Sequence, residues 1–524
     1  MFCCDFDPAH PVSEVASELV LFLSQEGLDA SGLLGLLGPT SLEALYRGEP
    51  GAVELVTSGS THRSHQLINA FYLHHHFTPS DFFALFECAQ HPHLASKLLE
   101  CRVAIEEDEG IRVVLDIRPH IIGAQEMWVF SDVDASLVDH IPNSDHVLGV
   151  GSASLSLLRS TPTSEVGSVL DLGTGSGVQL LGQSSSASVL VGTDIHQRAL
   201  DLCQATLSAN KVQAELINGS WFEPVKGRKF DRIVANPPFV VGLPEVGHVY
   251  RDSGLNLDEA SRLVVSQASD YLNVDGTAHL LAAWIHKADE PWQQRVASWI
   301  PSDGVSAWFM QRDVVDPATY VSTWLKDESI DPRSPEGRER TQLWLKHFAD
   351  NDVVGIGFGF VALQHIGESP SEVVAEDMSQ PFDDPLGPEV EEYFSRTRWL
   401  RDSDEETIGN SRYALRPGIA HEVISLSGDS THTAPDHMGF TKEVIRLTRT
   451  DGPRFSHEVD ETVTAILSGL NPHGLTLTEI CSLYAYAQDL DEEALLSEVT
   501  PLIVDLVRHG FVVPAQLLGG EVKG

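Results

Sequence analysis

Three alternating glycines that directly follow an apolar segment constrain the fold of this chain more than any other feature. Residues 168–172 have the composition of a buried strand, and Gly173, Gly175 and Gly177 come next, before a helical pattern begins. Glycine is needed where the backbone adopts open angles or where a ligand approaches the main chain without a Cβ in the way. Tight turns and dinucleotide sites share such runs, so the glycines alone predict a strand, a turn and a helix, but no particular ligand.

The glycine run opens a region in which short apolar segments alternate with helical patterns. This alternation continues to about residue 366 and is typical of a doubly wound α/β sheet, whose ligands bind at the carboxyl ends of the strands. A Rossmann-like sheet of seven strands is therefore expected, with strands at residues 168–172, 189–194, 214–217, 231–235, 277–284, 305–311 and 353–363.

Two of these expected strands end in polar residues suited to a ligand. Asp194 ends the second strand, nineteen residues beyond Gly175, where a carboxylate can accept both hydroxyls of a ribose. A surface carboxylate at a strand end is the alternative interpretation. The strand 231–235 is followed by Asn-Pro-Pro-Phe at residues 236–239. Because two prolines cannot extend a strand, they predict a rigid loop that presents the Asn236 side chain and a proline carbonyl as acceptors.

Together, the Asp-Leu-Gly-Thr-Gly-Ser-Gly run and the Asn-Pro-Pro-Phe loop resemble the class I S-adenosylmethionine-dependent methyltransferases that modify planar nitrogen. Their targets are exocyclic amines of adenine and guanine and the glutamine amide of release factors. The resemblance covers roughly residues 145–365. It implies an enzyme with a methyltransferase sheet and with S-adenosylmethionine as its cofactor, and the chemistry requires no metal.

The chemistry of a planar nitrogen indicates the candidate catalytic residues. An exocyclic amine or amide donates its lone pair into a π system and is a poor nucleophile, and two acceptors that hold both N–H groups favour a more pyramidal nitrogen. The Asn236 side-chain oxygen and the Pro237 carbonyl are expected to do this, on the loop that Pro238 makes rigid, while Phe239 stacks on the target. Asn236, Pro237, Pro238 and Phe239 are thus the candidate catalytic residues.

The same resemblance implies the cofactor-binding residues. Asp171, Gly173 and Gly175 would line the methionine part of the cofactor, and Asp194 would bind the ribose. Ser220 stands where the family often has an acid near the adenine, and Trp221 or Ile195 could supply an apolar wall. The expected set is Asp171, Gly173, Thr174, Gly175, Gly177, Asp194, Ile195, Ser220, Trp221 and Asn236, with no metal ligands. The loop at 146–152 either covers the cofactor or is a simple helix entry.

The flanking segments have a different character. Residues 1–144 show helical patterns followed by two β-rich runs, and residues 457–524 show three helical patterns and a short strand, so mostly helical, winged-helix-like recognition domains are expected at both ends. Residues 145–366 would form the methyltransferase domain. Residues 367–456 are rich in acidic residues, proline and serine, which favours an acidic linker or extended segment.

Charge limits the possible partners. The chain has 34 basic and 76 acidic residues, a net charge of −42, which excludes a globally basic nucleic-acid binder. The flanks hold most of this charge, and a small basic cluster, Lys226, Arg228, Lys229 and Arg232, precedes the Asn-Pro-Pro-Phe loop. No apolar run of about 18 residues and no secretory signal occur, and the six cysteines are scattered, which predicts a cytoplasmic protein without a membrane partner.

The substrate expected from these observations is an exocyclic amine of an RNA base, in ribosomal or transfer RNA. A glutamine amide in a release factor or another translation protein is the close alternative, because the acidic flanks suit a protein better than phosphate. A non-catalytic binding protein with a methyltransferase fold is the alternative from another class. The sequence does not indicate an oligomeric state.

Overall fold

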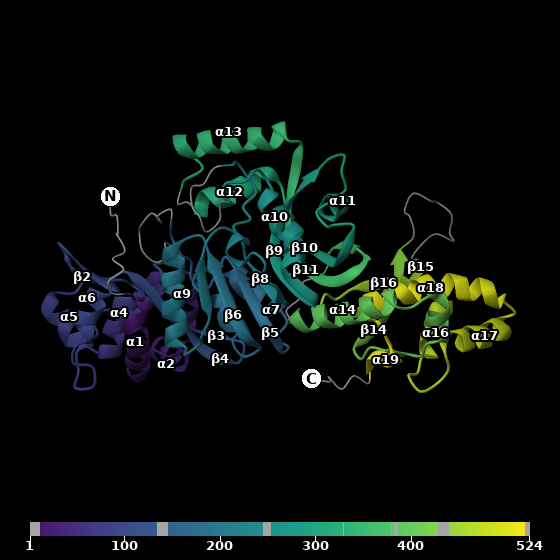
Figure 1. The fold of residues 1–524 in the computed structure, drawn as a ribbon, viewed down its shortest axis with the longest axis horizontal. Helices are drawn as coiled ribbons and strands as arrows, with labels where there is room; N and C mark the ends of the chain where they lie inside the picture. The colour runs from purple at the N-terminus through teal and green to yellow at the C-terminus, as the bar shows by residue number, and fades with distance from the viewer. Residues whose placement is uncertain are drawn as a thin grey trace. The chain divides into compact units, whose positions relative to one another are not determined.

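The computed structural model describes residues 11–133, 145–244, 253–327, 330–378, 380, 386–427 and 440–518 (Figure 1). It contains two compact units. The first comprises Met1–Leu158 and Thr163–Glu376, and the second comprises Arg159–Pro162 and Asp377–Gly524. The predicted division into four parts, at residues 144, 366 and 456, stays a prediction.

The first unit begins with helices that share one apolar core. They are α1 (Ser13–Gln25), α2 (Ala30–Tyr46), α3 (Pro50–Thr57), α4 (Arg63–Phe71), α5 (Pro79–Phe86) and α6 (Leu94–Glu100). Two hairpins follow: β1 (Ala104–Glu107) with β2 (Gly110–Val113), and β3 (Leu115–Ile122) with β4 (Gln125–Asp132). The β-rich runs of the sequence predicted a single hairpin, and the second hairpin, β3–β4, was not expected.

The β3–β4 hairpin is attached to helix α9 (Gln197–Ala209) of the large sheet. The Phe130 N–H donates to Thr206 Oγ1 at 3.0 Å, and Asn210 both accepts from the Trp128 N–H and donates to the Trp128 carbonyl, at 2.9 and 2.7 Å. Helix α1 lies beside α9 as well (Figure 1), and Leu202 of α9 belongs to the core of the N-terminal helices. The N-terminal part is therefore packed firmly against the sheet region.

The large sheet has the order β12-β10-β11-β9-β8-β5-β6-β7. Strands β7, β6, β5, β8 and β9 run parallel, whereas β11 is antiparallel to both β9 and β10. The seven predicted strands are β5 (Val166–Leu172), β6 (Ala187–Asp194), β7 (Glu215–Asn218), β8 (Phe230–Ala235), β9 (Leu272–Lys287), β10 (Asp303–Val315) and β11 (Val353–Pro370). A largely parallel α/β sheet is thus confirmed.

The expected number of seven strands is wrong by one. An eighth strand, β12 (Glu372–Asp377), lies at the edge of the sheet beside β10. Side chains add to the pairing of β12 with β10. Ser371 Oγ accepts from the Val305 N–H at 3.0 Å, and the Glu376 carboxylate accepts from Trp308 Nε1 at 2.6 Å. The acidic composition of this segment suggested a linker. The strand was not expected, because the sequence does not reveal that Glu376 accepts a hydrogen bond from Trp308.

Helices connect the strands and cover the sheet. They are α7 (Ser152–Ser160), α8 (Val178–Gln183), α9, α10 (Glu259–Ala268), α11 (Trp292–Ala297), α12 (Pro317–Asp327) and α13 (Pro335–Asp350), with short 3-10 turns at Glu223–Val225 and Ser269–Tyr271. Helices α10 and α11 share a core with β5, β8, β9, β10 and β11. Helices α12 and α13 pack with the C-terminal end of β9 and the N-terminal end of β11.

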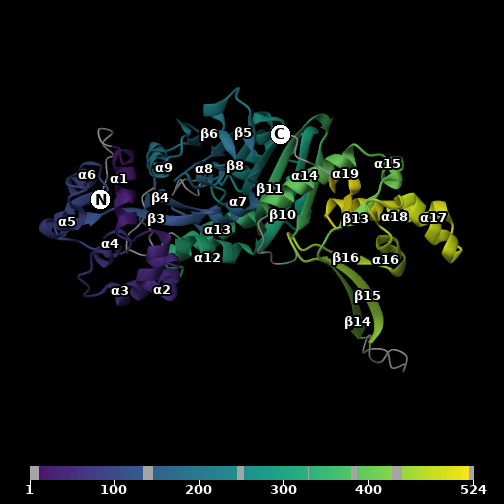
Figure 2. The same cartoon turned by 90° about the horizontal axis from the view of Figure 1, so that it is seen from below.

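The second unit is built from helices and two small sheets. It contains α14 (Gly387–Arg401), α15 (Glu405–Asn410), β13 (Tyr413–Leu415), β14 (Ile419–Ser427), β15 (Phe440–Arg449), β16 (Ser456–Val459), α16 (Glu461–Ser468), α17 (Leu477–Gln488), α18 (Glu492–Arg508), β17 (Val512–Pro514) and α19 (Ala515–Leu518). Strand β13 pairs with β17, and β14, β15 and β16 form the other sheet, whose β14–β15 hairpin extends away from the helices of this unit (Figure 2). The three helices and the short strand predicted near the C-terminus correspond to α16, α17, α18 and β17.

The expectation of a linker or extended stretch at residues 367–456 does not describe this segment, which holds α14, α15 and the strands β12, β13, β14 and β15. The reason lies in its charges. Arg396 and Arg449 each donate from Nη2 to one oxygen of the buried Glu389 carboxylate, both at 2.6 Å. Arg449 is itself fully buried. Charged side chains that suggested a solvated segment instead form ion pairs inside the unit.

No single helix of the described residues is long and apolar enough to span a membrane. Helices α1 and α2 reach that length and composition only as a pair joined across a bend of 56°.

Candidate functional site

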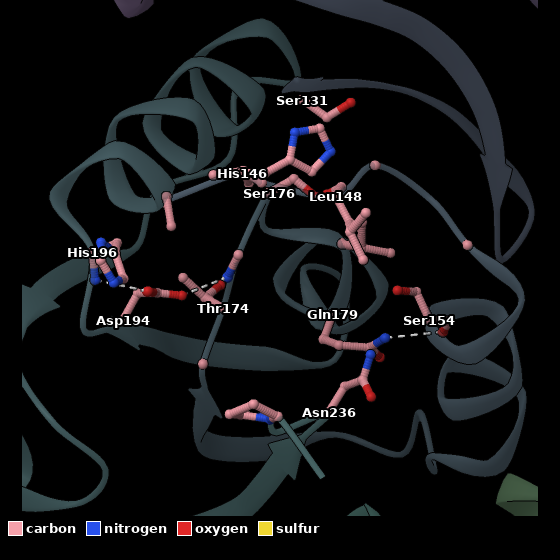
Figure 3. A pocket seen from close by; sticks show the side chains of 18 of the residues that line it. Ser131, His146, Leu148, Ser154, Thr174, Ser176, Gln179, Asp194, His196 and Asn236 are labelled. Atoms are coloured by element: carbon pink, nitrogen blue, oxygen red, sulfur yellow. Dashed lines mark hydrogen bonds between the residues drawn. The ribbon is translucent and has the colours of Figure 1, made fainter. Parts of the chain in front are cut away.

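A cavity of about 820 Å³ opens where the parallel strands β5, β6 and β8 end (Figure 3). Its wall includes most of the predicted site residues, which the sheet brings together from the ends of β5, β6, β7 and β8: Gly173, Thr174, Gly175, Asp194, Ile195, Ser220, Trp221, Asn236, Pro237 and Pro238. Three predicted residues, Asp171, Gly177 and Phe239, are not part of the wall. The carboxyl edge of the sheet is thus where the chemistry-bearing residues meet.

The three glycines of the loop after β5 have different structural reasons. All have positive φ, 74° at Gly173, 53° at Gly175 and 84° at Gly177. A Cβ on Gly173 or Gly175 would meet no atom within 4 Å, so these two leave open space. A Cβ on Gly177 would lie 2.8 Å from Cys203 Sγ, so the third glycine permits close packing of the loop on α9.

Asp171 supports the loop from beneath. Its side chain is buried and accepts a hydrogen bond from Thr174 Oγ1 at 2.7 Å. Burial raises the pKa of the Asp171 carboxyl to about 7; the Thr174 hydrogen bond opposes the rise and the charge of Asp194 adds to it. The residue that the resemblance placed beside the methionine part of a cofactor therefore lies behind the cavity wall and holds the loop in shape.

This raised pKa predicts a pH-dependent stability. Because the folded-state pKa lies above the ordinary value of 3.8, Asp171 keeps its proton when folded and loses it when unfolded, so its contribution to stability falls as pH rises from about 4 to 7. The Asp171→Asn variant lacks this loss. We therefore expect the free energy of unfolding of the variant, relative to that of the wild type, to increase by on the order of 2–4 kcal/mol between pH 4 and 7.5. Urea denaturation at each pH measures both free energies. Parallel pH profiles of the two proteins would contradict the assignment.

Asp194 is placed at the end of β6 by its own backbone contacts. One carboxylate oxygen accepts the Gly175 N–H at 3.0 Å and the other accepts the His196 N–H at 2.9 Å (Figure 3). Burial raises the pKa of Asp194, although these two N–H groups oppose the rise. A carboxylate has about four acceptor positions, so both oxygens keep capacity for hydroxyl groups of a ligand in the cavity.

The end of β7 forms the neighbouring part of the wall. The Asn218 amide donates to the carbonyls of Asp194 and Ile195, at 3.2 and 3.0 Å, which joins the ends of β6 and β7. Ile195 is 54% exposed beside the cavity, and Trp221, with φ of 49°, is half-buried against the core. The apolar wall expected from the sequence is thus present at the cavity, together with Ser220.

The Asn-Pro-Pro loop after β8 closes another side of the cavity. Asn236 lies on the same side as Gln179, whose amide donates to the Ser154 carbonyl at 2.9 Å (Figure 3). Within the described part of the chain, the Asn236 side chain makes no hydrogen bond, so its oxygen is available to a ligand. Phe239, predicted to stack on the target, is half-buried against the cluster that contains Tyr320 and Phe348.

Sequence reasoning missed part of the cavity wall. The loop before α7 lines the cavity with His146 and Leu148, and it is held in place because Asp132 accepts the Val147 N–H at 2.8 Å and Ser176 donates to the Leu148 carbonyl at 2.9 Å. Its glycines were a usable signal, and both expectations for this loop, a cover for the cofactor or a simple helix entry, stay predictions. Five residues from the end of α2 and from the β3–β4 hairpin had no signal in the sequence and also line the cavity: Tyr46, Asp116, Arg118, His120 and Val129.

Comparison with known protein families covers the same region. One family model, described as the methyltransferase small domain, matches residues 146–283. A second family model, a domain of unknown function (DUF7782), matches residues 391–514. The glycine loop, Asp194 and Asn236 all lie within the segment that the first model matches. No group of three or more His, Cys, Asp or Glu residues that could hold a metal occurs among the described residues.

Curated relatives are similar to this chain over about a quarter to a third of its length. The ribosomal RNA small subunit methyltransferase C of Haemophilus influenzae (strain 86-028NP) is 36% identical over 132 residues, 24% of this chain and 36% of the relative. Its counterpart in Escherichia coli (strain K12) is 34% identical over 167 residues, 31% and 44% of the two chains. The release factor glutamine methyltransferase of Aliivibrio fischeri is 33% identical over 128 residues, 24% and 43%. The chain thus spans less than half the length of each of these relatives.

Solved structures give weaker likenesses. The 16S rRNA methyltransferase RsmC of T. thermophilus, in complex with AdoMet and guanosine, is 21% identical and covers 40% of this chain and 57% of its own, with a TM-score of 0.26. An rRNA methylase from Streptococcus thermophilus is 10% identical and covers 42% and 100%, with a TM-score of 0.24. Values this low support no conclusion by themselves.

Proposed function

We propose that the protein is an S-adenosylmethionine-dependent N-methyltransferase that acts on an exocyclic amine of an RNA base. The observation that carries this proposal is the position of Asn236. Its amide lines the same cavity as the glycine loop and Asp194, and it has no hydrogen bond to any other described residue. A polar side chain held at a cavity wall with its oxygen unused is suited to bind a donor group of a substrate.

The cavity fits S-adenosylmethionine by the chemistry of its wall. The open space beside Gly173 and Gly175 allows a ligand to approach the bare backbone, and Asp194 offers acceptors for two ribose hydroxyls. Ile195 and Trp221 provide apolar surface for an adenine ring. When bound, S-adenosylmethionine supplies an electrophilic methyl group.

The residues of the loop after β8 prepare the target nitrogen. The Asn236 oxygen and the Pro237 carbonyl each accept one N–H of the amine, which favours the pyramidal form of the nitrogen and holds its lone pair in one direction. Pro238 lines the cavity and offers an apolar surface to the planar target. Because Phe239 packs into the cluster with Tyr320, we propose that it supports the loop from behind rather than stacking on the target.

The RNA base is favoured over the second candidate, a glutamine amide of a translation protein. The ribosomal RNA methyltransferases named above match up to 167 residues of the chain, and the release factor glutamine methyltransferase matches 128. The glutamine amide remains a specific second candidate, because the same cavity residues suit an amide nitrogen. Both substrates imply a cytoplasmic protein. We propose residues 1–144 and 457–524 as its winged-helix-like recognition modules.

Labelling of a knockout lysate distinguishes the two substrates. The purified protein and S-adenosylmethionine with a tritiated methyl group are added to lysate from a strain that lacks the gene, and the products are treated with RNase or protease. We expect the label to be released by RNase, because an RNA base carries the methyl group. Label that survives RNase and is released by protease would move the proposal to the glutamine amide, and no label in either fraction would contradict both.

A further inference from the structure

The cavity continues beyond the residues that suit a cofactor. On the side of the N-terminal hairpin it is lined by Tyr46, Asp116, Arg118, His120 and Val129, which we call the hairpin recess. These residues come from the end of α2 and from β3 and β4, and they lie outside the segment that matches the methyltransferase small domain. The N-terminal part of the chain therefore contributes a wall of its own to the cavity.

Arg118 is the charged group of the hairpin recess, and its environment is unusual. The residue is only 7% exposed, and its guanidinium lies over the Tyr72 ring at 5.6 Å. Its Nε is 2.7 Å from the Asp116 carboxylate, whereas Nη2 has no hydrogen-bond partner among the described residues. Burying a guanidinium that lacks hydrogen-bond partners is costly, and an anionic oxygen bound to this side chain at the cavity wall would offset that cost with a charge-assisted hydrogen bond.

The recess is rigid before any ligand arrives. Strand β4 is fixed to α9 by the hydrogen bonds of Trp128 and Phe130 described above. Asp132, at the end of β4, is paired with Arg198 of α9, whose Nε lies 3.1 Å from the carboxylate. Because Asp132 is already held by a cation, it does not compete for Arg118. The guanidinium is thus pre-positioned relative to the cavity, which lowers the entropic cost of binding.

Two aromatic rings complete the recess. The Tyr46 and His120 rings are 6.0 Å apart, and Tyr46 is 46% exposed. Burial, together with the charge of Arg118, lowers the pKa of His120 to about 4, so the imidazole is neutral at physiological pH. Single-stranded RNA is bound by such means, with bases stacked on aromatic rings and phosphates held by arginine.

We propose that the hairpin recess binds a nucleotide of the substrate RNA, with Arg118 donating to a phosphate oxygen and the Tyr46 and His120 rings contacting the base. This inference rests on the proposed function, since it adds a neighbouring nucleotide to the one that is methylated. The negative charge of Asp116 offsets the positive charge of Arg118. The recess therefore selects a phosphate that accepts a hydrogen bond rather than any polyanion.

The test compares guanosine 5′-monophosphate with guanosine, by isothermal titration in the presence of saturating S-adenosylhomocysteine, which occupies the cofactor site. We expect the 5′-phosphate to increase affinity about 10-fold or more in the wild type, as for other charge-assisted hydrogen bonds, and this gain to vanish in Arg118→Met. Arg118→Lys, which keeps the charge but loses the planar fork, should keep only part of it. In methyl transfer to RNA, Arg118→Met should raise KM and leave kcat unchanged.

Arg112→Met is the matched control. Arg112 belongs to the neighbouring hairpin, pairs with Glu107 at 2.9 Å and does not line the cavity. The proposal is overturned if the phosphate brings no gain in the wild type, if the gain persists in both Arg118 variants, or if Arg112→Met abolishes it equally. Because the titration requires no methyl transfer, it is independent of the proposed function. Protein as the labelled substrate, with an Arg118-dependent phosphate gain, would refute the RNA substrate and its bound nucleotide, and would leave Arg118 only as a phosphate-binding residue.

Discussion

Replacing Asn236 by alanine is expected to lower kcat for methyl transfer by about 100- to 1000-fold, with the affinity for S-adenosylmethionine essentially unchanged. The side-chain oxygen faces the cavity without a partner in the described chain, so no packing or hydrogen bond of the fold depends on it. Its acceptor works most strongly when the nitrogen becomes pyramidal, and interactions that strengthen in the transition state appear in kcat.

Single-turnover transfer of a tritiated methyl group measures the first quantity, and isothermal titration measures the second. Asn273→Ala is the matched control, because Asn273 donates to Asp231 at 2.7 Å and lies outside the cavity wall. Asn236→Asp, which preserves size and an acceptor oxygen, should retain more activity than the alanine variant. Unchanged kcat in Asn236→Ala would refute the role of Asn236, and a parallel loss of cofactor affinity would assign it to cofactor binding instead.

Replacing Asp194 by alanine is expected to weaken S-adenosylmethionine binding by at least about 100-fold. Hydrogen bonds to a charged group are worth about 1.5–3 kcal/mol each, and the carboxylate can accept from two ribose hydroxyls. The variant also loses the contacts that hold the Gly175 and His196 N–H groups, at 3.0 and 2.9 Å, so the glycine loop itself becomes less ordered.

Isothermal titration measures the affinity, and thermal unfolding without ligand shows whether the fold survives. Asp201→Ala is the control, since Asp201 lies on α9, accepts from Gln197 at 2.9 Å and does not line the cavity. Asp194→Asn should bind with an intermediate affinity, because one oxygen acceptor remains. Wild-type affinity in a folded Asp194→Ala protein would refute the placement of the cofactor in this cavity.

The sheet and much of the candidate site could be predicted because their signals are local. A strand that ends in glycines, a carboxylate that ends the next strand and an Asn-Pro-Pro turn are each readable within a few residues. The carboxyl ends of parallel strands then meet at one edge of the sheet. All seven expected strands are present, and Asp194 and Asn236 line one cavity with Gly173 and Gly175.

Other features of the fold and the cavity depend on side-chain contacts that the residue pattern does not show. Asp171 lies behind the wall because Thr174 turns back onto it, and Phe239 packs into the cluster formed by helices α12 and α13, which follow about 80 residues or more later in the chain. Strand β12 belongs to the sheet through Trp308 and Glu376. The pattern of a segment does not contain these contacts.

The amino-acid sequence by itself therefore determined the α/β sheet, the glycine loop and the residue types at its carboxyl edge, because backbone conformation and hydrogen-bonding chemistry restrict those positions to few residues. Only the tertiary structure decided which side chains face the cavity and which support it. It also brought Arg118 to the cavity, because Thr206 and Asn210 anchor the β3–β4 hairpin. These two residues follow their partners Phe130 and Trp128 by 76 and 82 positions in the chain. Burial and pairing depend on such long-range packing, which no local pattern encodes.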